Sequence, residues 1–137
     1  MLYFRCSFGN EKVVRIFKTK FFAKWAKKEK LKDFTLVKAV HEMDLGLVDA
    51  DLGSNVYKKR ISLNSSGKRG GARSIIAYRR LDKAFFIFGY SKNERSNISD
   101  KQKQVLKLLS QDLFSYSAGK IEGLLEAKEL IEVQTNE

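Results

Sequence analysis

The sequence contains no proline, one cysteine (Cys6) and one histidine (His41) among its 137 residues. A single cysteine excludes an internal disulfide, and with one histidine it cannot complete a nitrogen–sulfur metal site. We therefore expect no bound metal and no cofactor. No apolar run approaches the roughly 20 residues of a membrane-spanning helix, and the N-terminus lacks a secretory signal pattern. These absences favour a protein of the reducing cytoplasm without a membrane partner.

Acidic residues are missing from the middle of the chain, between Leu52 and Leu81. The whole chain carries 27 basic and 16 acidic residues, a formal net charge of +11, and the excess lies in residues 1–80. A surface of this kind repels itself, and binding of a polyanion explains it best. The composition therefore points to a nucleic acid. Eight basic residues occupy the acid-free stretch: Lys58, Lys59, Arg60, Lys68, Arg69, Arg73, Arg79 and Arg80.

Hydrophobic periodicity predicts an α+β fold. Residues 13–19 are rich in β-branched and aromatic residues, which predicts a first strand. Two amphipathic helices are expected next, the second with Asp33 as its N-cap, and together they would form a helical hairpin. An antiparallel meander of strands at 56–63, 73–80 and 83–90 follows. A last helix, capped by Ser99 or Asp100, should bury a stripe of Val105, Leu108, Leu109 and Leu113.

Three parts of the chain are distinguished by sequence. Residues 1–12 form an N-terminal extension to which no role is assigned, and residues 13–113 form the main domain. Residues 114–137 form an acidic tail that contains an expected helix (KIEGLLEAKE) and a short apolar run (LIEV). The sequence leaves open whether this tail is docked or free.

The first basic cluster lies on an expected strand. Because side chains alternate between the two faces of a strand, Lys58 and Arg60 should emerge together and Lys59 on the opposite face. The glycine-rich segment 64–72 (NSSGKRGGA) is expected as a turn. It is either a solvated hairpin tip or a basic loop whose backbone amides approach phosphates. It lacks the spacing of a P-loop.

Several motifs in a fixed order resemble one family. YKKR, GKRGGARSIIAY and AFFIFGYSKNERSNIS, followed by QKQVLKLL, are similar to the RelE/ParE superfamily of bacterial toxins, and more narrowly to HigB-type RelE toxins. The resemblance implies a RelE-like microbial RNase fold, with a small antiparallel sheet, an N-terminal helical hairpin and a C-terminal helix. It also implies the toxin of a type II toxin–antitoxin system, a ribosome-dependent endoribonuclease that cleaves mRNA and inhibits translation. The implied partners are the ribosome, mRNA and an antitoxin of helix-turn-helix type, with operator DNA reached only through the antitoxin.

The resemblance also implies site residues. Lys58 and Arg60 match the basic positions that RelE toxins carry on this strand, and Arg73 matches the arginine after their glycine turn. Two positions depart from the family, because Asn93 and Ser99 stand where well-known RelE toxins have an arginine and a tyrosine. Lys92, Glu94 and Tyr90 are candidates for a compensating group, and the sequence does not choose among them.

RNA carries its own nucleophile, the 2′-hydroxyl, so a catalyst must orient it, move its proton and stabilise the charged phosphorane. Without a suitably placed histidine, lysine and arginine must do this, which predicts a metal-independent endoribonuclease. We expect catalytic roles for Lys58, Arg60 and Arg73, with Lys92 and Glu94 as further candidates. Lys59, Lys68, Arg69, Arg79 and Arg80 are expected to contact RNA.

Two alternatives remain open. A ParE-like toxin would inhibit gyrase and cut no RNA, and a basic module would bind RNA without catalysis. Basic side chains on a strand, together with Arg73, favour the nuclease. The sequence does not decide the codon preference, the general base and acid, or the identity and stoichiometry of the antitoxin.

Overall fold

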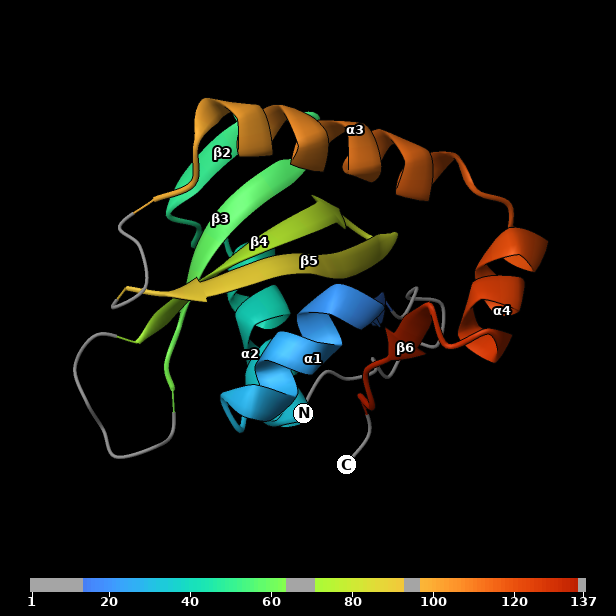
Figure 1. The fold of residues 1–137 in the computed structure, drawn as a ribbon, viewed down its shortest axis with the longest axis horizontal. Coiled ribbons are helices and arrows are strands. Elements are labelled where there is room, and N and C mark those ends of the chain that lie inside the picture. Colours follow the sequence, from blue (N-terminus) through green and yellow to red (C-terminus); the bar gives the residue numbers. More distant parts are fainter. Residues whose placement is uncertain (1–13, 64–70, 93–96, 136–137) are drawn as a thin grey trace.

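A six-stranded sheet of order β2-β3-β4-β5-β1-β6 forms the centre of the molecule, and helices lie on both of its faces (Figure 1). The structure is a computed structural model that describes residues 14–63, 71–92 and 97–135. Its strands are β1 (Arg15–Thr19), β2 (Ala50–Gly53), β3 (Val56–Ile61), β4 (Ala72–Arg79), β5 (Lys83–Ser91) and β6 (Leu130–Glu132). Its helices are α1 (Lys20–Lys28), α2 (Asp33–Asp44), α3 (Asp100–Ser115) and α4 (Ala118–Glu126). Within the described ranges, no helix is both long and apolar enough to cross a bilayer.

Two cores lie on opposite faces of this sheet. Helices α1 and α2 cover one core, in which Phe22, Leu36 and Val40 are buried against strand residues. Helices α3 and α4 cover the other core, which includes Leu113 and Ile121. The predicted α+β class is therefore confirmed, with the sheet as the middle of three layers.

The start of α2 differs from the prediction. Lys32 is the N-cap residue and makes no side-chain cap hydrogen bond, whereas Asp33 is the first helical residue. The carboxylate of Asp33 has other partners, since it pairs with Lys18 Nζ at 3.0 Å and accepts the backbone N–H of Gln134 at 3.1 Å. Tertiary contacts to β1 and to the C-terminal segment thus take the side chain that was expected to cap the helix.

The sheet is mixed, so the prediction of a purely antiparallel sheet is wrong at one pairing. Strand β1 runs parallel to β5, with Phe17 opposite Phe85. Both rings are fully buried and stack at 5.1 Å between centroids. Insertion of β1 beside β5 therefore places its aromatic side chain in the core. Strand β2 pairs with β3 and comes from a segment in which the sequence predicted no strand.

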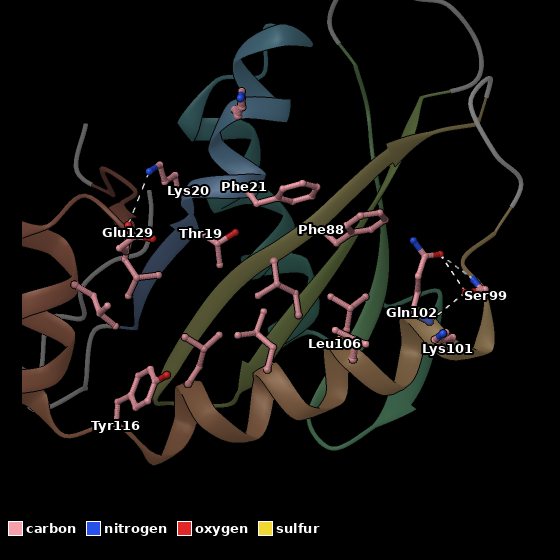
Figure 2. Close-up of a pocket in the computed structure, with 17 residues that line it drawn as sticks. Thr19, Lys20, Phe21, Phe88, Ser99, Lys101, Gln102, Leu106, Tyr116 and Glu129 are labelled. Carbon is pink, nitrogen blue, oxygen red and sulfur yellow. Dashed lines mark hydrogen bonds and ion pairs between the residues drawn. The ribbon is translucent and has the colours of Figure 1, made fainter.

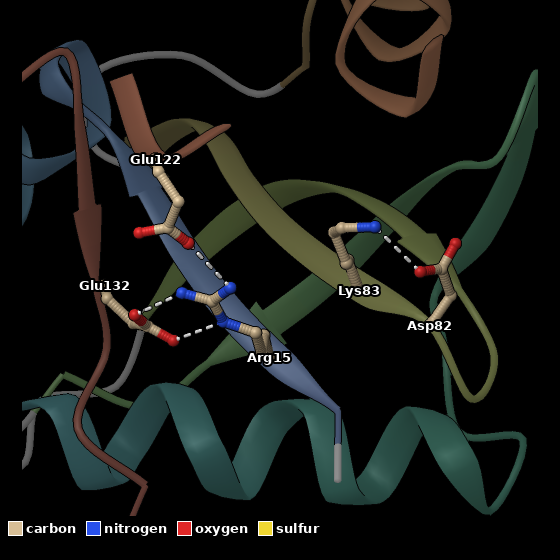
Figure 3. Close-up of polar contacts among 5 residues, drawn as sticks. All are labelled: Arg15, Asp82, Lys83, Glu122 and Glu132. Atoms are coloured by element: carbon tan, nitrogen blue, oxygen red, sulfur yellow. Dashed lines mark hydrogen bonds and ion pairs between the residues drawn. The ribbon is translucent and has the colours of Figure 1, made fainter. Parts of the chain in front are cut away.

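The C-terminal segment is docked onto the fold, which the sequence had left open. Strand β6 pairs antiparallel with β1. Arg15 on β1 donates to both carboxylate oxygens of Glu132 at 2.7 and 2.8 Å, and to Glu122 on α4 at 3.1 Å (Figure 3). Ile121 and Leu130 are buried at 1% and 3% exposure. Apolar burial and a bidentate ion pair thus hold the segment in place.

Helix α3 begins with the capping box that its sequence favours, formed by Ser99 and Gln102. Its buried stripe is Leu106, Ser110 and Leu113, which differs from the predicted one because Val105 and Leu108 are 58% and 61% exposed. The Ser110 hydroxyl donates to the carbonyl of Ser54 at 2.9 Å. This polar contact and the packing of Leu106 orient the helix, which leaves two large apolar side chains at the surface.

A β-bulge in β5 decides which side chains face α3. Ile75 on β4 is opposite Phe88, but Ile76 is opposite Phe86, so Ile87 is an extra residue. The bulge shifts the alternation that follows it. Phe88 and Tyr90 consequently pack in the core beneath α3, whereas Gly89 lies directly against the ring of Trp25.

We expect Gly89→Ala to destabilise the protein by about 1–3 kcal/mol, the usual cost of overpacking. A Cβ at this position would lie 2.4 Å from two ring carbons of Trp25. Gly89 is paired with Ser74 in the sheet, which restricts any backbone shift that would relieve the clash. Urea denaturation followed by circular dichroism measures the change. The matched control is Gly123→Ala in α4, where a Cβ meets nothing within 4 Å; it should stabilise the helix by about 0.5–1 kcal/mol. Equal stability of Gly89→Ala and the parent would contradict the close packing.

Candidate active site

Strand β3 presents its basic residues on two different faces. Lys59 is buried at 7% exposure, whereas Arg60 is exposed and Lys58 is half-buried. The predicted alternation of Lys58 and Arg60 against Lys59 is therefore confirmed. Lys59 belongs to the face covered by α2, where its Nζ pairs with Glu42 Oε1 at 2.8 Å. The hydrogen bond from Lys59 lowers the pKa of the Glu42 carboxyl below its ordinary value.

Strand register brings two arginines and a tyrosine into one row. Arg60 is directly opposite Arg73, and Arg73 is directly opposite Tyr90. Residues directly opposite one another in an antiparallel pair project to the same side, with Cα atoms about 4.5–5.5 Å apart. Lys58 is two residues from Arg60 on the same face, opposite Ile75. We call Lys58, Arg60, Arg73 and Tyr90 the basic row.

A carboxylate that the sequence analysis did not select contacts this row. Asp49 Oδ2 lies 3.3 Å from Arg73 Nε, and the Arg73 side chain is 14% exposed. The backbone N–H of Asp49 donates to the carbonyl of Lys58 at 2.8 Å, just before β2 begins. The sequence distinguishes Asp49 only by its position, because Asp49 and Asp51 are the last acidic residues before the acid-free stretch.

The remaining predicted residues are spread more widely. Lys92 is exposed and follows Ser91, whose partner is Ala72, so it lies at the same end of the sheet as Arg73. Arg79 is at the other end of β4, six residues from Arg73, or about 20 Å along an extended strand. There it pairs with Asp82 at 3.2 Å and stacks over Phe114, and the exposed Arg80 comes next. Lys68, Arg69 and Glu94 lie outside the described residues.

A groove of about 870 Å³ lies between α1 and α3 (Figure 2). It adjoins the basic row at Tyr90, whose ring centroid lies 6.1 Å from that of the groove-lining Phe88. Phe21 of α1 and Phe88 of β5 line the groove and stack at 5.8 Å between ring centroids. Val105 and Leu109 of α3 also line it. Its basic lining residues are Lys20, Lys24 and Lys101. Strand β1 pairs with β5 only as far as Phe86, so within the described chain the edge of β5 beyond the bulge has no strand beside it.

Comparison with known protein families matches residues 14–133 to the model described as "RelE toxin of RelE / RelB toxin-antitoxin system". No match is found among curated proteins. The matched residues run from the residue before β1 to the residue after β6, and they include the strands that carry the basic row. RelE toxins are generally endoribonucleases, and each pairs with an antitoxin. The chain therefore belongs to the RelE toxin family and is the toxin of a toxin–antitoxin system.

Proposed function

We propose that this toxin is a ribosome-dependent endoribonuclease that cleaves mRNA in the cytoplasm without a metal ion, and that it is of the HigB type. The observation that carries the proposal is the basic row, in which Arg60 and Arg73 are directly opposite each other with Lys58 on the same face. Like charges placed opposite one another destabilise a sheet. Asp49 offsets part of this repulsion at Arg73. An anionic ligand would offset the positive charge that remains on Lys58 and Arg60, and an RNA phosphate has the required charge.

In the proposed mechanism, the 2′-hydroxyl of the RNA attacks the adjacent phosphate. Arg73 and Arg60 bind the phosphate oxygens, where two guanidinium groups stabilise the charge that develops in the transition state. Lys58 acts as the base that accepts the 2′-hydroxyl proton or as a further phosphate ligand. Lys92 lies at the same end of the sheet as Arg73, and we propose it as a candidate to protonate the leaving 5′-oxygen. Glu94 is a second candidate for proton transfer.

The proposed RNA contacts extend from the basic row. Lys68 and Arg69, which lie outside the described residues, are proposed as further RNA contacts because they are basic residues of the glycine-rich segment before Arg73. Arg79 and Arg80 would contact RNA or ribosome at the far end of β4. Lys59 was also expected to contact RNA, but it is buried on the face covered by α2 and pairs with Glu42, so no direct RNA contact is proposed for it.

The burial of the aromatic residues on β5 argues against the simple RNA-binding module. Single-stranded RNA is bound by such modules through exposed aromatic rings on a strand, but Phe85 and Phe86 are 0% exposed. The gyrase-inhibiting alternative is tested directly. Purified translating ribosomes with mRNA, compared with a gyrase supercoiling assay, separate a nuclease from a ParE-like toxin. Loss of supercoiling activity with intact mRNA would contradict the proposal.

We propose that the antitoxin, of helix-turn-helix type and itself the link to operator DNA, binds the groove between α1 and α3 with an amphipathic acidic segment. The groove is lined by apolar side chains such as Phe21 and Val105, both more than half exposed. Its lysines favour acidic residues in the partner. Electrostatic attraction alone would favour the basic row as the binding site of the antitoxin. Burial of apolar surface contributes most to stable association, which favours the groove.

Lys58→Ala combined with Arg60→Ala should abolish growth arrest and mRNA cleavage, because the two cations that β3 contributes to the basic row are removed. Growth after induced expression and cleavage of ribosome-bound mRNA measure the loss. The control, Arg79→Ala with Arg80→Ala, removes the same charge from the far end of β4 and should have the smaller effect. A folded Lys58/Arg60 variant that arrests growth as well as the parent does would place the site elsewhere.

Arg73→Lys should slow cleavage by about 10²-fold, the scale of losing one preorganised charge-stabilising donor. A lysine keeps the charge but offers a point donor in place of the planar fork. Because the charge is unchanged, ribosome affinity and its salt dependence should barely move. Single-turnover cleavage on saturating ribosomes measures the rate. A parental rate would show that Arg73 is an anchor and not a catalytic residue.

Val105→Glu should weaken antitoxin binding by about 10-fold or more, since it would bury an unpaired carboxylate in an apolar interface. Leu108→Glu is the matched control. It lies on the same helix at similar exposure, 61% against 58%, but does not line the groove. Isothermal titration calorimetry with the cognate antitoxin compares them. Equal affinities for the two variants, with strong weakening by salt, would favour antitoxin binding across the basic row.

A further inference from the structure

We propose that Asp49 is a positioning residue that holds the guanidinium of Arg73 in the orientation needed to bind the scissile phosphate. The inference rests on the proposed function and extends it, since it adds a residue that neither the motifs of the sequence nor the family match selects. Asp49 does not itself touch RNA in this proposal. It acts through Arg73.

The first step of the argument is the anchoring of Asp49. Its backbone N–H donates to the carbonyl of Lys58 at 2.8 Å, and the next residue, Ala50, pairs with Lys58 in the sheet. The main chain of Asp49 is therefore attached to the strand that carries Lys58 and Arg60. Movement of its carboxylate is limited to side-chain rotation, and the group is 29% exposed.

The second step is the edge of the guanidinium that Asp49 occupies. Asp49 Oδ2 lies 3.3 Å from Nε of Arg73. A guanidinium has five N–H donors in a fixed plane, one on Nε and four on the terminal nitrogens. A carboxylate on the Nε side leaves the terminal nitrogens available for two oxygens of a phosphate. The carboxylate therefore fixes the plane of the fork without filling its outer edge.

The third step is charge. Arg60 and Arg73 are directly opposite each other. Repulsion between the two guanidinium groups would drive them apart and toward solvent. The Arg73 side chain is nevertheless only 14% exposed. Asp49 supplies the negative charge that offsets this repulsion beside the sheet. Without it, we expect Arg73 to sample several rotamers and to lose its preorganisation for the transition state.

The competing role for the same contact is inhibition. A carboxylate beside Arg73 could stand in for a phosphate and have to leave before RNA binds, in which case its removal would tighten RNA binding and raise the rate. The two roles predict opposite changes in the cleavage rate for Asp49→Asn, a decrease if Asp49 positions Arg73 and an increase if it blocks the phosphate site. The asparagine keeps the size and an accepting oxygen but removes the charge.

The matched control is Glu42→Gln. Glu42 also pairs with a basic residue of the sheet, Lys59 at 2.8 Å, but on the face covered by α2. Both substitutions change a carboxylate to an amide and raise the net charge by the same amount. Any general gain in attraction for the ribosome therefore cancels in the comparison.

Single-turnover cleavage of ribosome-bound mRNA should be about 10- to 100-fold slower at saturation in Asp49→Asn than in the parent, the effect of losing a close ion pair that preorganises Arg73 for the transition state. The half-saturating ribosome concentration should stay equal to that of Glu42→Gln. In a double-mutant cycle, Asp49→Asn should cost little once Arg73 is lysine, because its effect passes through Arg73. Additive losses, or a rate at or above the parental one, would overturn the inference.

A second measurement does not depend on cleavage. The ¹H–¹⁵N signal of Arg73 Nε, assigned through its absence in Arg73→Lys, should be protected from solvent exchange in the free parent protein. Protection should be lost in Asp49→Asn and kept in Glu42→Gln. An unprotected signal in the parent would overturn the inference, whereas a protected signal in a parent that leaves ribosome-bound mRNA intact would overturn the proposed function instead.

Discussion

The register of β3, β4 and β5 is the constraint on which the rest of the site depends. It places Arg60, Arg73 and Tyr90 in one row across three strands. A slip of one residue would send every side chain of a strand to the opposite face. The β-bulge at Ile87 preserves this arrangement on β5, because without the extra residue Tyr90 would face Trp25.

Opposite charges are distributed so that the site keeps its excess of cations. On the face covered by α2, Glu42 pairs with Lys59, and this cation is withdrawn from solvent. Asp49, which lines the same cavity as Glu42, contacts Arg73 while leaving Arg60 exposed. Each carboxylate thus stabilises the sheet where a cation would be costly, and the remaining positive charge faces outward.

The C-terminal elements complete the fold and, with α1, form a second surface. Arg15 joins β1 to β6 and α4 through Glu132 and Glu122. The groove between α1 and α3 meets the basic row at one point, where the groove-lining Phe88 packs against Tyr90. Strand β1 pairs with β5 only as far as Phe86, which leaves this edge of β5 without a neighbouring strand in the part of the chain that the structure describes.

The sequence by itself determined the α+β class, the alternation of Lys58 and Arg60 on β3, and the Ser99 cap of α3, because periodicity and capping are local properties. Tertiary structure decided the parallel pairing of β1 with β5 and the docking of the C-terminal segment, since both join residues far apart in the chain. It also decided the partner of Arg73. Asp49 lies 24 residues earlier in the sequence, and only the folding of β2 against β3 brings its carboxylate to the guanidinium.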